Sequence, residues 1–346
     1  MRVLIVSSYL PERCGIAKYA WQLAEHLRRQ GHVVNVLAPP GSMSDFCEPL
    51  KGKLGPLKVL KYAFFYDKVL LNFHESFFYQ SGVLNRAFTH LSFALLFLLA
   101  RNLEVICHEY PKLEGRGLLG WLDRKVLKLI WSLAPRVVFH TERELSGFSK
   151  LFGVPRERLG LRRHGESFMR FAAAGKLEAR RKLSLSPSDF ILLCIGFIQP
   201  HKGFDRVVKA FKKVKSSRVK LYIVGSIRLF TREYIEYLRE LRRLASECSG
   251  VHLVYRYISD EEFDLWIASS DVVVLPYREI WSSGVLERAK LYGKPVIASD
   301  VGGVADQLSS SDYLFKSDEE LEELLQELAE LADEALSRRE DRDSTV

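Results

Sequence analysis

The chain has 346 residues, which is more than one hydrophobic core usually organises, so we expect two domains. Hydrophobic residues make up 47% of it and charged residues 27%, a composition typical of globular proteins that excludes disordered and fibrous classes. The net charge is +8, but residues 318–334 hold nine acidic and no basic side chains, so the rest of the chain carries +17. Such a basic body favours an anionic partner: a nucleotide diphosphate, a phospholipid surface or a nucleic acid.

Signals for export or membrane insertion are not expected in this sequence. Residues 1–10 contain one basic residue and a short apolar run that is typical of a buried strand and not of a signal peptide. The longest dense apolar run, residues 91–100, is far shorter than the roughly 20 residues that span a bilayer. The five cysteines form no Cys-x-x-Cys pair, which argues against a disulfide framework and a zinc site. We therefore expect a cytoplasmic protein with reduced thiols.

Strand and helix patterns alternate along the first half of the chain. A β-branched strand at residues 2–8 is followed by a loop that contains Gly15, a helical period that ends at Gly31, and a second strand. This order predicts a βαβ unit and a parallel sheet. Three further apolar runs continue the alternation to about residue 165: 68–73, 104–107 and 136–139. We expect a Rossmann-like domain over residues 1–170, on the side where a second substrate, the acceptor, would bind.

The same alternation restarts after a mixed polar stretch at residues 164–182. Strands are predicted at 189–196, 219–225, 251–255, 271–276 and 295–300, with helices between them. This pattern predicts a second doubly wound domain, over residues 171–318, that binds the nucleotide part of a ligand. Residues 319–346 are predicted to form an amphipathic acidic helix and a tail.

Two loops at predicted strand ends could bind phosphate. Gly15 lies near the start of the first helix, where backbone N–H groups and the helix dipole favour an anion, although a glycine here is often only a turn residue. The loop has neither the GxGxxG pattern of NAD enzymes nor a Walker motif. In the second half, Lys202 follows a strand in GFIQPHKG, and its ammonium would suit a diphosphate; a solvated surface lysine is the alternative.

The segment EIWSSGVLE contains the strongest chemical signal. Glu279 is predicted in a loop after a strand, and Glu287 about two turns into the next helix. This spacing would let Glu279 face a reacting sugar while Glu287 accepts hydrogen bonds from ribose hydroxyls. Ser283, Gly284 and Val285 would form the helix N-terminus between them, where free N–H groups can hold a phosphate.

With these motifs the sequence resembles family-four glycosyltransferases of the GT-B fold, which are retaining enzymes built from two Rossmann-like domains facing a cleft. The matching segments are PERCGIAKYAWQLAEHLRRQGHVV, RVVFHTERE, GFIQPHKG, KLYIVGS and PYREIWSSGVLERAKLYGKPVIASDVGG. The resemblance implies that Glu279 and Glu287 are the paired glutamates of the donor site and that Lys202 binds the diphosphate. It also implies that Gly15 approaches the phosphates, that Gly225 in KLYIVGS belongs to the donor site, and that His108 in VICHEY lies beside the reacting centre.

Two positions depart from the family pattern. Phe197 stands where members often carry an arginine, so neutralisation of the phosphates would depend on Lys202, with His201 or Arg228 as possible substitutes. Asp306 replaces a usual glutamate and keeps the carboxylate.

The resemblance implies transfer of a hexose of mannose or glucose type from a nucleotide-diphosphate sugar to a hydroxyl acceptor, such as a lipid-linked or cell-surface glycan precursor. Glu279, His108 and Lys202 would form the catalytic set, with Lys202 and helix N–H groups stabilising the leaving diphosphate. The Asp-x-Asp pattern occurs only at residues 341–343, in a predicted tail, so we expect no essential metal and no cofactor.

Basic and aromatic residues alternate in two segments of the first half, residues 51–68 and 117–133. Such segments can lie on an anionic membrane, and the acceptor could be met there; the alternative is helices packed on the sheet with a solvated basic edge.

Two other functions stay open, a nucleotide-sugar epimerase of the same architecture and a non-catalytic sugar-nucleotide-binding protein. A nucleic-acid partner is not expected, because no recognition helix or aromatic single-strand module stands out. The donor base, the sugar, the acceptor and the oligomeric state are left open.

Overall fold

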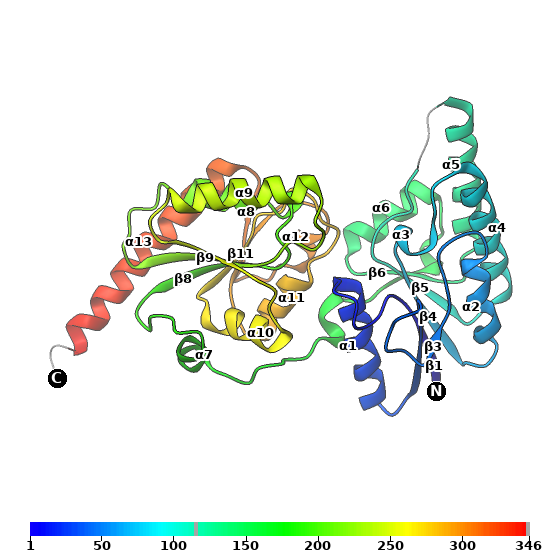
Figure 1. Cartoon of the computed structure of the whole chain (residues 1–346), viewed down its shortest axis with the longest axis horizontal. Helices are drawn as coiled ribbons and strands as arrows, with labels where there is room; N and C mark the ends of the chain where they lie inside the picture. The colour runs from blue at the N-terminus through cyan, green and yellow to red at the C-terminus, as the bar shows by residue number, and fades with distance from the viewer. Residues whose placement is uncertain (114–116, 344–346) are drawn as a thin grey trace. The chain divides into compact units, whose positions relative to one another are not determined.

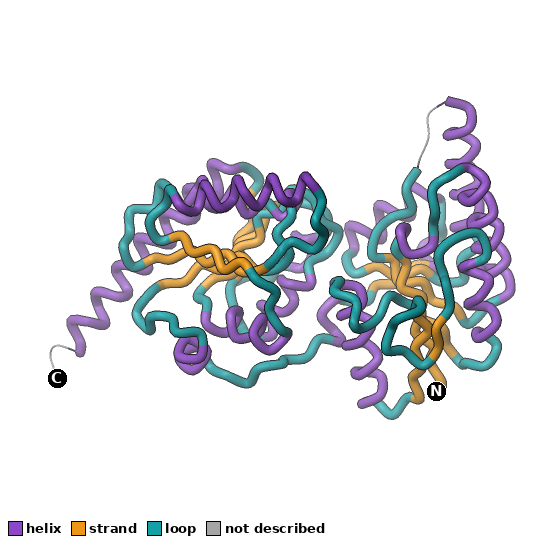
Figure 2. The backbone as a smooth tube through the Cα atoms, viewed as in Figure 1, coloured by secondary structure: helices purple, strands orange, loops and turns teal. Residues whose placement is uncertain are grey.

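The computed structural model describes residues 1–113 and 117–343, and the chain divides into two compact units, Met1–Phe168 and Met169–Val346. Each unit is a parallel β-sheet with helices on its faces, as the tube drawing shows (Figure 2). The predicted pair of Rossmann-like domains is confirmed. Among the described residues, no helix is both long and apolar enough to cross a bilayer.

Seven strands form the sheet of the first unit, in the order β3-β2-β1-β4-β5-β6-β7 (Figure 1). They are β1 Arg2–Val6, β2 Val33–Ala38, β3 Phe46–Cys47, β4 Lys68–Phe73, β5 Leu103–Cys107, β6 Val137–Phe139 and β7 Leu159–Leu161. The strands are short and rich in Val, Leu and Ile because both faces of a parallel sheet are normally covered. The strand order reverses between β1 and β4, which places a switch point at their carboxyl ends.

Helix α1 (Gly15–Arg29) packs on one face of this sheet, where Tyr19 and Leu23 join Val3 and Ile5 in a core. The other face is covered by α2 (Gly55–Ala63), α4 (Val83–Leu99), α5 (Gly117–Ser132) and α6 (Glu142–Phe152), around an aromatic core centred on Trp131. Three short helical turns complete the unit: α3 (Glu75–Phe78), η1 (Arg156–Arg158) and η2 (His164–Ser167).

Six strands form the sheet of the second unit, in the order β10-β9-β8-β11-β12-β13. They are β8 Phe190–Ile195, β9 Val219–Gly225, β10 Val251–Tyr255, β11 Val272–Leu275, β12 Val296–Ser299 and β13 Tyr313–Phe315. The helical segments are α7 Lys176–Lys182, η3 Pro200–Lys202, α8 Phe204–Phe211, α9 Arg232–Ser246, α10 Asp260–Ser269, α11 Gly284–Leu291, α12 Val304–Gln307 and α13 Asp318–Asp343. The switch point of this sheet lies between β8 and β11.

The acidic helix α13 packs on the second unit through one face. Leu321, Leu325, Ala329 and Ala332 are buried in the core that also contains α8 and α9, whereas Leu331 is exposed. The predicted Asp-x-Asp tail, residues 341–343, ends this helix, and its side chains lie outside the described residues.

Candidate functional site

The two loops that carry Lys202 and Glu279 follow β8 and β11, the strands on either side of the switch point in the second unit. They touch backbone to backbone at Gly203, whose φ is +68°. A Cβ atom at this position would lie 2.0 Å from the carbonyl oxygen of Pro276, so only glycine fits there. The sheet topology therefore brings together two sequence motifs that lie about 75 residues apart.

An ion pair between the exposed Arg278 and the buried Asp205 fixes the Glu279 loop to the Lys202 loop. Both terminal nitrogens of Arg278 lie 2.7 Å from the carboxylate oxygens of Asp205, and the Arg278 backbone N–H donates to the carbonyl of His201 at 2.8 Å. Burial alone would raise the pKa of Asp205, but hydrogen bonds from Arg278 and Tyr237 outweigh it and lower that pKa. The bidentate geometry holds the backbone next to Glu279 in one position.

The ammonium of Lys202 lies over the ring of Tyr277, with Nζ 4.3 Å from the ring centroid. Among the described residues it forms no ion pair with a carboxylate, and burial lowers its pKa to about 8. The Tyr277 hydroxyl is 3.0 Å from Ser283 Oγ, which places this cation near the start of α11. A desolvated cation without a counter-ion is suited to an anionic ligand.

The first turn of α11 offers two backbone donors, and not the three expected from the sequence. Ser283 is the N-cap residue, and its Oγ accepts from the Leu286 N–H at 3.2 Å. Its own N–H already donates to Gln307 Oε1 at 2.7 Å, so the prediction that Ser283 N–H holds a phosphate is wrong. Gly284 and Val285 follow, and the described chain supplies no acceptor for their N–H groups.

Glu287 lies on α11 one turn further and is held by Gln307. The Gln307 amide donates to Glu287 Oε1 at 2.8 Å, and the same side chain bonds to both backbone groups of Ser283. Gln307 is buried, so it fixes the carboxylate and the helix start together. Sequence reasoning noted the neighbouring Asp306, which is exposed, and missed Gln307.

Gly196 after β8 and Gly225 at the end of β9 lie close together, and Gly196 faces Val285 of α11. Gly225 has φ of +153°, and a Cβ there would lie 1.8 Å from the carbonyl oxygen of Gly196. A Cβ on Gly196 would be 4.0 Å from the Val285 side chain. Glycine at position 225 therefore permits a close backbone contact with Gly196.

Glu279 is exposed at the loop, next to His201. Burial lowers the pKa of His201, Lys202 lowers it further, and Glu279 opposes both effects, so the three side chains are electrostatic neighbours. Phe197 is half-buried and supplies no charge, and Arg228 is exposed in the loop after β9. Because its pKa is lowered, His201 is neutral at pH 7, so Lys202 is the cation of this neighbouring group.

In the first unit, His108 follows β5 and belongs to a buried chain of hydrogen-bonding groups. Its Nε2 lies 2.8 Å from Asn72 Oδ1 and its Nδ1 lies 3.3 Å from His140 Nε2. His140 Nδ1 lies 3.0 Å from the carbonyl oxygen of Arg162, which can only accept. Burial lowers the pKa of His108, and His140 and His74 lower it further, so the ring is neutral at pH 7.

The carbonyl of Arg162 determines the tautomer of both rings. His140 must donate from Nδ1, so it accepts at Nε2, and His108 must then donate from its own Nδ1. A neutral His108 accepts at Nε2, where Asn72 Oδ1 is also an acceptor, while Asn72 Nδ2 is buried without a partner. A half-turn of the Asn72 amide resolves this mismatch by pointing Nδ2–H at His108.

His140 and His164, which sequence reasoning missed, pack with His108 around Tyr19 of α1. The His140 and His164 rings are stacked with centroids 4.3 Å apart, and Tyr19 meets all three rings edge on. The Tyr19 hydroxyl is buried and has no hydrogen-bond partner among the described residues. Both histidines follow short strands, β6 and β7, and that position at a strand end was the available signal.

Gly15 is the first residue of α1, after an N-cap formed by Cys14, whose Sγ accepts from the Ala17 N–H at 3.2 Å. A Cβ on Gly15 would meet no atom within 4 Å. Gly15 is exposed, and the space beside it is open.

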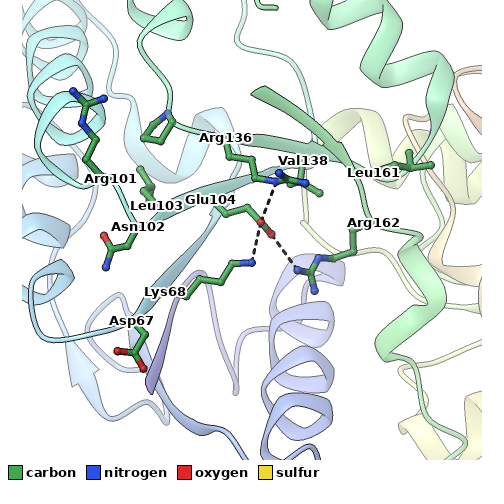
Figure 3. Close-up of a pocket in the computed structure, with 11 residues that line it drawn as sticks. Asp67, Lys68, Arg101, Asn102, Leu103, Glu104, Arg136, Val138, Leu161 and Arg162 are labelled. Carbon is green, nitrogen blue, oxygen red and sulfur yellow. Dashed lines mark hydrogen bonds and ion pairs between the residues drawn. The ribbon is translucent and has the colours of Figure 1, made fainter. Parts of the chain in front are cut away.

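A polar cavity of about 590 Å³ lies on the sheet of the first unit (Figure 3). Glu104 lies at its centre, with Lys68 and Arg162 nitrogens at 3.0 Å and Arg136 at 3.5 Å. The buried carboxylate neutralises part of this basic cluster and holds the Arg162 segment whose carbonyl orients His140.

The second unit also matches a known protein family. Residues 175–344 match the family model described as glycosyl transferases group 1. The second unit belongs to the group 1 glycosyltransferase family. A D-inositol 3-phosphate glycosyltransferase of Pseudarthrobacter chlorophenolicus is 28% identical over 179 residues, which cover 50% of this chain and 41% of that protein. A GDP-mannose-dependent monoacylated alpha-(1-6)-phosphatidylinositol monomannoside mannosyltransferase of Corynebacterium glutamicum is 27% identical over 172 residues, which cover 47% of this chain and 43% of that protein.

The matching part of the chain spans less than half the length of these curated relatives. Its fold is shared more widely: the crystal structure of HepE of Anabaena in complex with UDP matches with a TM-score of 0.69, at 18% identity, over 97% of this chain and 90% of that chain. These matches confirm the resemblance to family-four glycosyltransferases and show the GT-B fold.

Proposed function

We propose that the protein is a retaining glycosyltransferase that moves a hexose from a nucleotide-diphosphate sugar to a hydroxyl acceptor. One observation carries the proposal: the unpaired Lys202 ammonium lies near the α11 N-terminus, where the N–H groups of Gly284 and Val285 are open. A cation and two convergent N–H groups at a switch point are the elements that bind a diphosphate. The match of the second unit to the group 1 family supports it.

In this proposal the leaving diphosphate rests on Lys202 and the α11 N-terminus, which stabilise the charge that develops as the bond to the sugar breaks. Glu287 accepts hydrogen bonds from the ribose, and Glu279 faces the sugar. The acceptor hydroxyl attacks the face that the nucleotide leaves, and the departing phosphate takes the proton.

His108 belongs to the proposed catalytic set through the position of its ring. Both of its nitrogens are engaged inside the first unit, by Asn72 and His140. Its ring would therefore shape the space for the reacting sugar, and proton transfer would be left to the phosphate.

The sugar and acceptor are proposed from the relatives. The Corynebacterium glutamicum relative is named for GDP-mannose and a phosphatidylinositol monomannoside, and the HepE structure contains UDP. We propose a UDP or GDP donor carrying a mannose or glucose type sugar, and a lipid-linked or cell-surface glycan precursor as acceptor, met at a membrane surface. No observation favours the epimerase or the non-catalytic alternative.

A comparison of the two glutamates tests the proposal. Thermal-shift screening with UDP and GDP identifies the nucleotide, because a ligand of the folded state raises the melting temperature. In calorimetric titrations, Glu287→Gln should weaken nucleotide binding by about 1 to 3 kcal/mol, the scale of a lost hydrogen bond to a charged group. Glu279→Gln should leave that affinity nearly unchanged and lower kcat.

Glu261→Gln, on the exposed first turn of α10, is the matched control and should change neither quantity. If nucleotide binding weakens in Glu279→Gln and is unaffected in Glu287→Gln, the proposed placement of the donor is reversed. If neither nucleotide stabilises the protein at any concentration, the proposed donor class is wrong.

A further inference from the structure

Helix α4 carries apolar side chains on two opposite sides. Phe93, Leu96 and Phe97 are buried in the core of the first unit. The opposite side is also apolar and is exposed; it consists of Leu84, Phe88, Leu91, Leu95 and Leu98. These five residues follow one another at spacings of four and three, so they form a continuous stripe along one side of the helix.

The neighbouring helix α5 repeats this arrangement. Leu127, Ile130 and Trp131 are buried, whereas the other side exposes Leu118, Trp121, Leu122, Val126 and Leu129. The two helices pack side by side (Figure 1), joined by Arg86, whose Nε lies 3.0 Å from both carboxylate oxygens of Asp123. We call the two exposed stripes together the α4–α5 face. An apolar surface of this kind on a globular protein marks an interaction site.

Cations border the α4–α5 face. Lys53 Nζ lies 5.4 Å from the ring centroid of Phe88, and Lys125 Nζ lies 5.6 Å from that of Trp121. Residues 1–168 contain 24 Lys and Arg against 14 Asp and Glu, so the whole first unit is basic. Apolar residues flanked by lysines, with a tryptophan at their edge, match the layered chemistry of an anionic bilayer surface.

We propose that the α4–α5 face inserts into the headgroup and acyl boundary of an anionic lipid bilayer. The exposed leucines would enter the acyl region, and the bordering lysines would pair with lipid phosphates. A second copy of the chain is the poorer occupant, because a two-fold interface would bring two basic borders together. The proposal deepens the proposed function by naming the surface on which the acceptor is met, but it does not depend on catalysis.

This surface changes the expectation drawn from the sequence. Residues 51–68 and 117–133 predicted adsorption through lysines, which salt screens beyond a Debye length of about 10 Å at 0.1 M. The α4 stripe, absent from that prediction, adds an apolar contribution that salt does not screen. We therefore expect partial retention on anionic vesicles at high salt.

Sedimentation with phosphatidylcholine vesicles, with and without phosphatidylglycerol, tests the proposal. The protein should bind the mixed vesicles, and the double substitution Leu91→Glu with Leu95→Glu should weaken binding about tenfold or more, because two leucines no longer enter the acyl region. Leu177→Glu is the matched control: Leu177 is 61% exposed on α7 of the second unit, and its variant should bind as the unchanged protein does. The substituted leucines are exposed in both variants, so both should keep the melting temperature of the unchanged protein.

Trp121 supplies a second readout. Its fluorescence should shift to shorter wavelength with mixed vesicles, and Trp121→Phe should remove that shift. Equal binding to both vesicle types would show that anionic lipid is not required, and would overturn the proposal. A second copy of the chain would be the occupant if the unchanged protein does not bind vesicles and light scattering shows that it is a dimer. In that case the double variant should be a monomer. If vesicle binding follows the expected pattern while UDP and GDP leave the melting temperature unchanged, the proposed function fails and this proposal stands.

Discussion

At the scale of single residues, Lys202 has the most unusual surroundings in the second unit. Its ammonium lies against the Tyr277 ring and has no carboxylate partner among the described residues, so its pKa falls to about 8. A bound diphosphate would restore the missing counter-charge and raise that pKa again. Binding and protonation of this lysine are therefore linked.

We predict that nucleotide-diphosphate affinity is nearly constant around pH 7 and falls above pH 8, where free Lys202 loses its proton. The fall approaches tenfold per pH unit until the pKa of the complex is reached. Calorimetry in buffers of different ionisation enthalpy should detect proton uptake near pH 8. Lys202→Ala should bind weakly and without this pH dependence; an unchanged pH profile in that variant would remove Lys202 from the site.

We also predict that His140→Phe changes the tautomer of His108. The variant removes the acceptor for His108 Nδ1–H, so the proton moves to Nε2, and the Asn72 amide turns back so that its Oδ1 accepts this proton. Two-bond ¹H–¹⁵N spectra should show exchanged nitrogen shifts for His108. The unfolding free energy should fall by about 1 to 3 kcal/mol, because the Arg162 carbonyl loses its partner. His252→Phe in β10 is the control, and an unchanged His108 spectrum in His140→Phe would contradict the deduced tautomer.

The sequence was informative where a residue acts from a strand end, and less so where it acts through a neighbour. Lys202 and Glu279 could be placed because strand, loop and helix patterns locate switch-point loops. Gln307 and Arg278 could not, because their importance depends on hydrogen bonds to residues far away in the sequence. For the same reason the free N–H of Ser283 was predicted wrongly.

At the scale of elements, the start of α11 depends on one amide side chain. Gln307, at the end of α12, bonds to the N–H and C=O of Ser283 and to Glu287, so it sets both the helix start and the direction of the carboxylate. A change at position 307 should therefore affect stability and ligand binding together.

Gln307→Leu should lower the unfolding free energy by about 1 to 3 kcal/mol, because the buried backbone groups of Ser283 lose their partners. Nucleotide affinity should fall as well, because Glu287 is no longer held. Denaturant titration and calorimetry measure the two effects. Gln326→Leu, on the exposed side of α13, is the control. Wild-type nucleotide affinity in Gln307→Leu would mean that Glu287 needs no such support.

The type of an element could be predicted where its sequence pattern is long. The prediction failed where tertiary contacts define the element. The run at residues 68–73 coincides with β4, whereas β3, β7 and α3 have two to four residues and carry no periodicity of their own. Helix α4 was noted only as an apolar run, because its two opposite stripes leave no polar side to reveal a period.

At the scale of the whole molecule, each of the two units is a parallel sheet covered by helices, and all the charge proposed for donor binding comes from the protein. Lys202 and the N–H groups of α11 neutralise the phosphates in the proposal, so no divalent cation is assigned a role. We predict that transfer persists in excess EDTA. Loss of activity that Mg²⁺ or Mn²⁺ restores would show that a metal shares this task.

The burial of Lys202 also has a chemical consequence. With a pKa lowered to about 8, a far larger share of the Lys202 amines is uncharged near neutral pH than of ordinary lysines. An uncharged amine is a nucleophile, so Lys202 should react with acylating reagents and cyanate ahead of the other lysines, wherever the open side of the phosphate site admits them. A nucleotide diphosphate bound there would protect it. Brief labelling followed by peptide mass spectrometry, with and without UDP or GDP, would read the occupancy of the site without any acceptor or sugar.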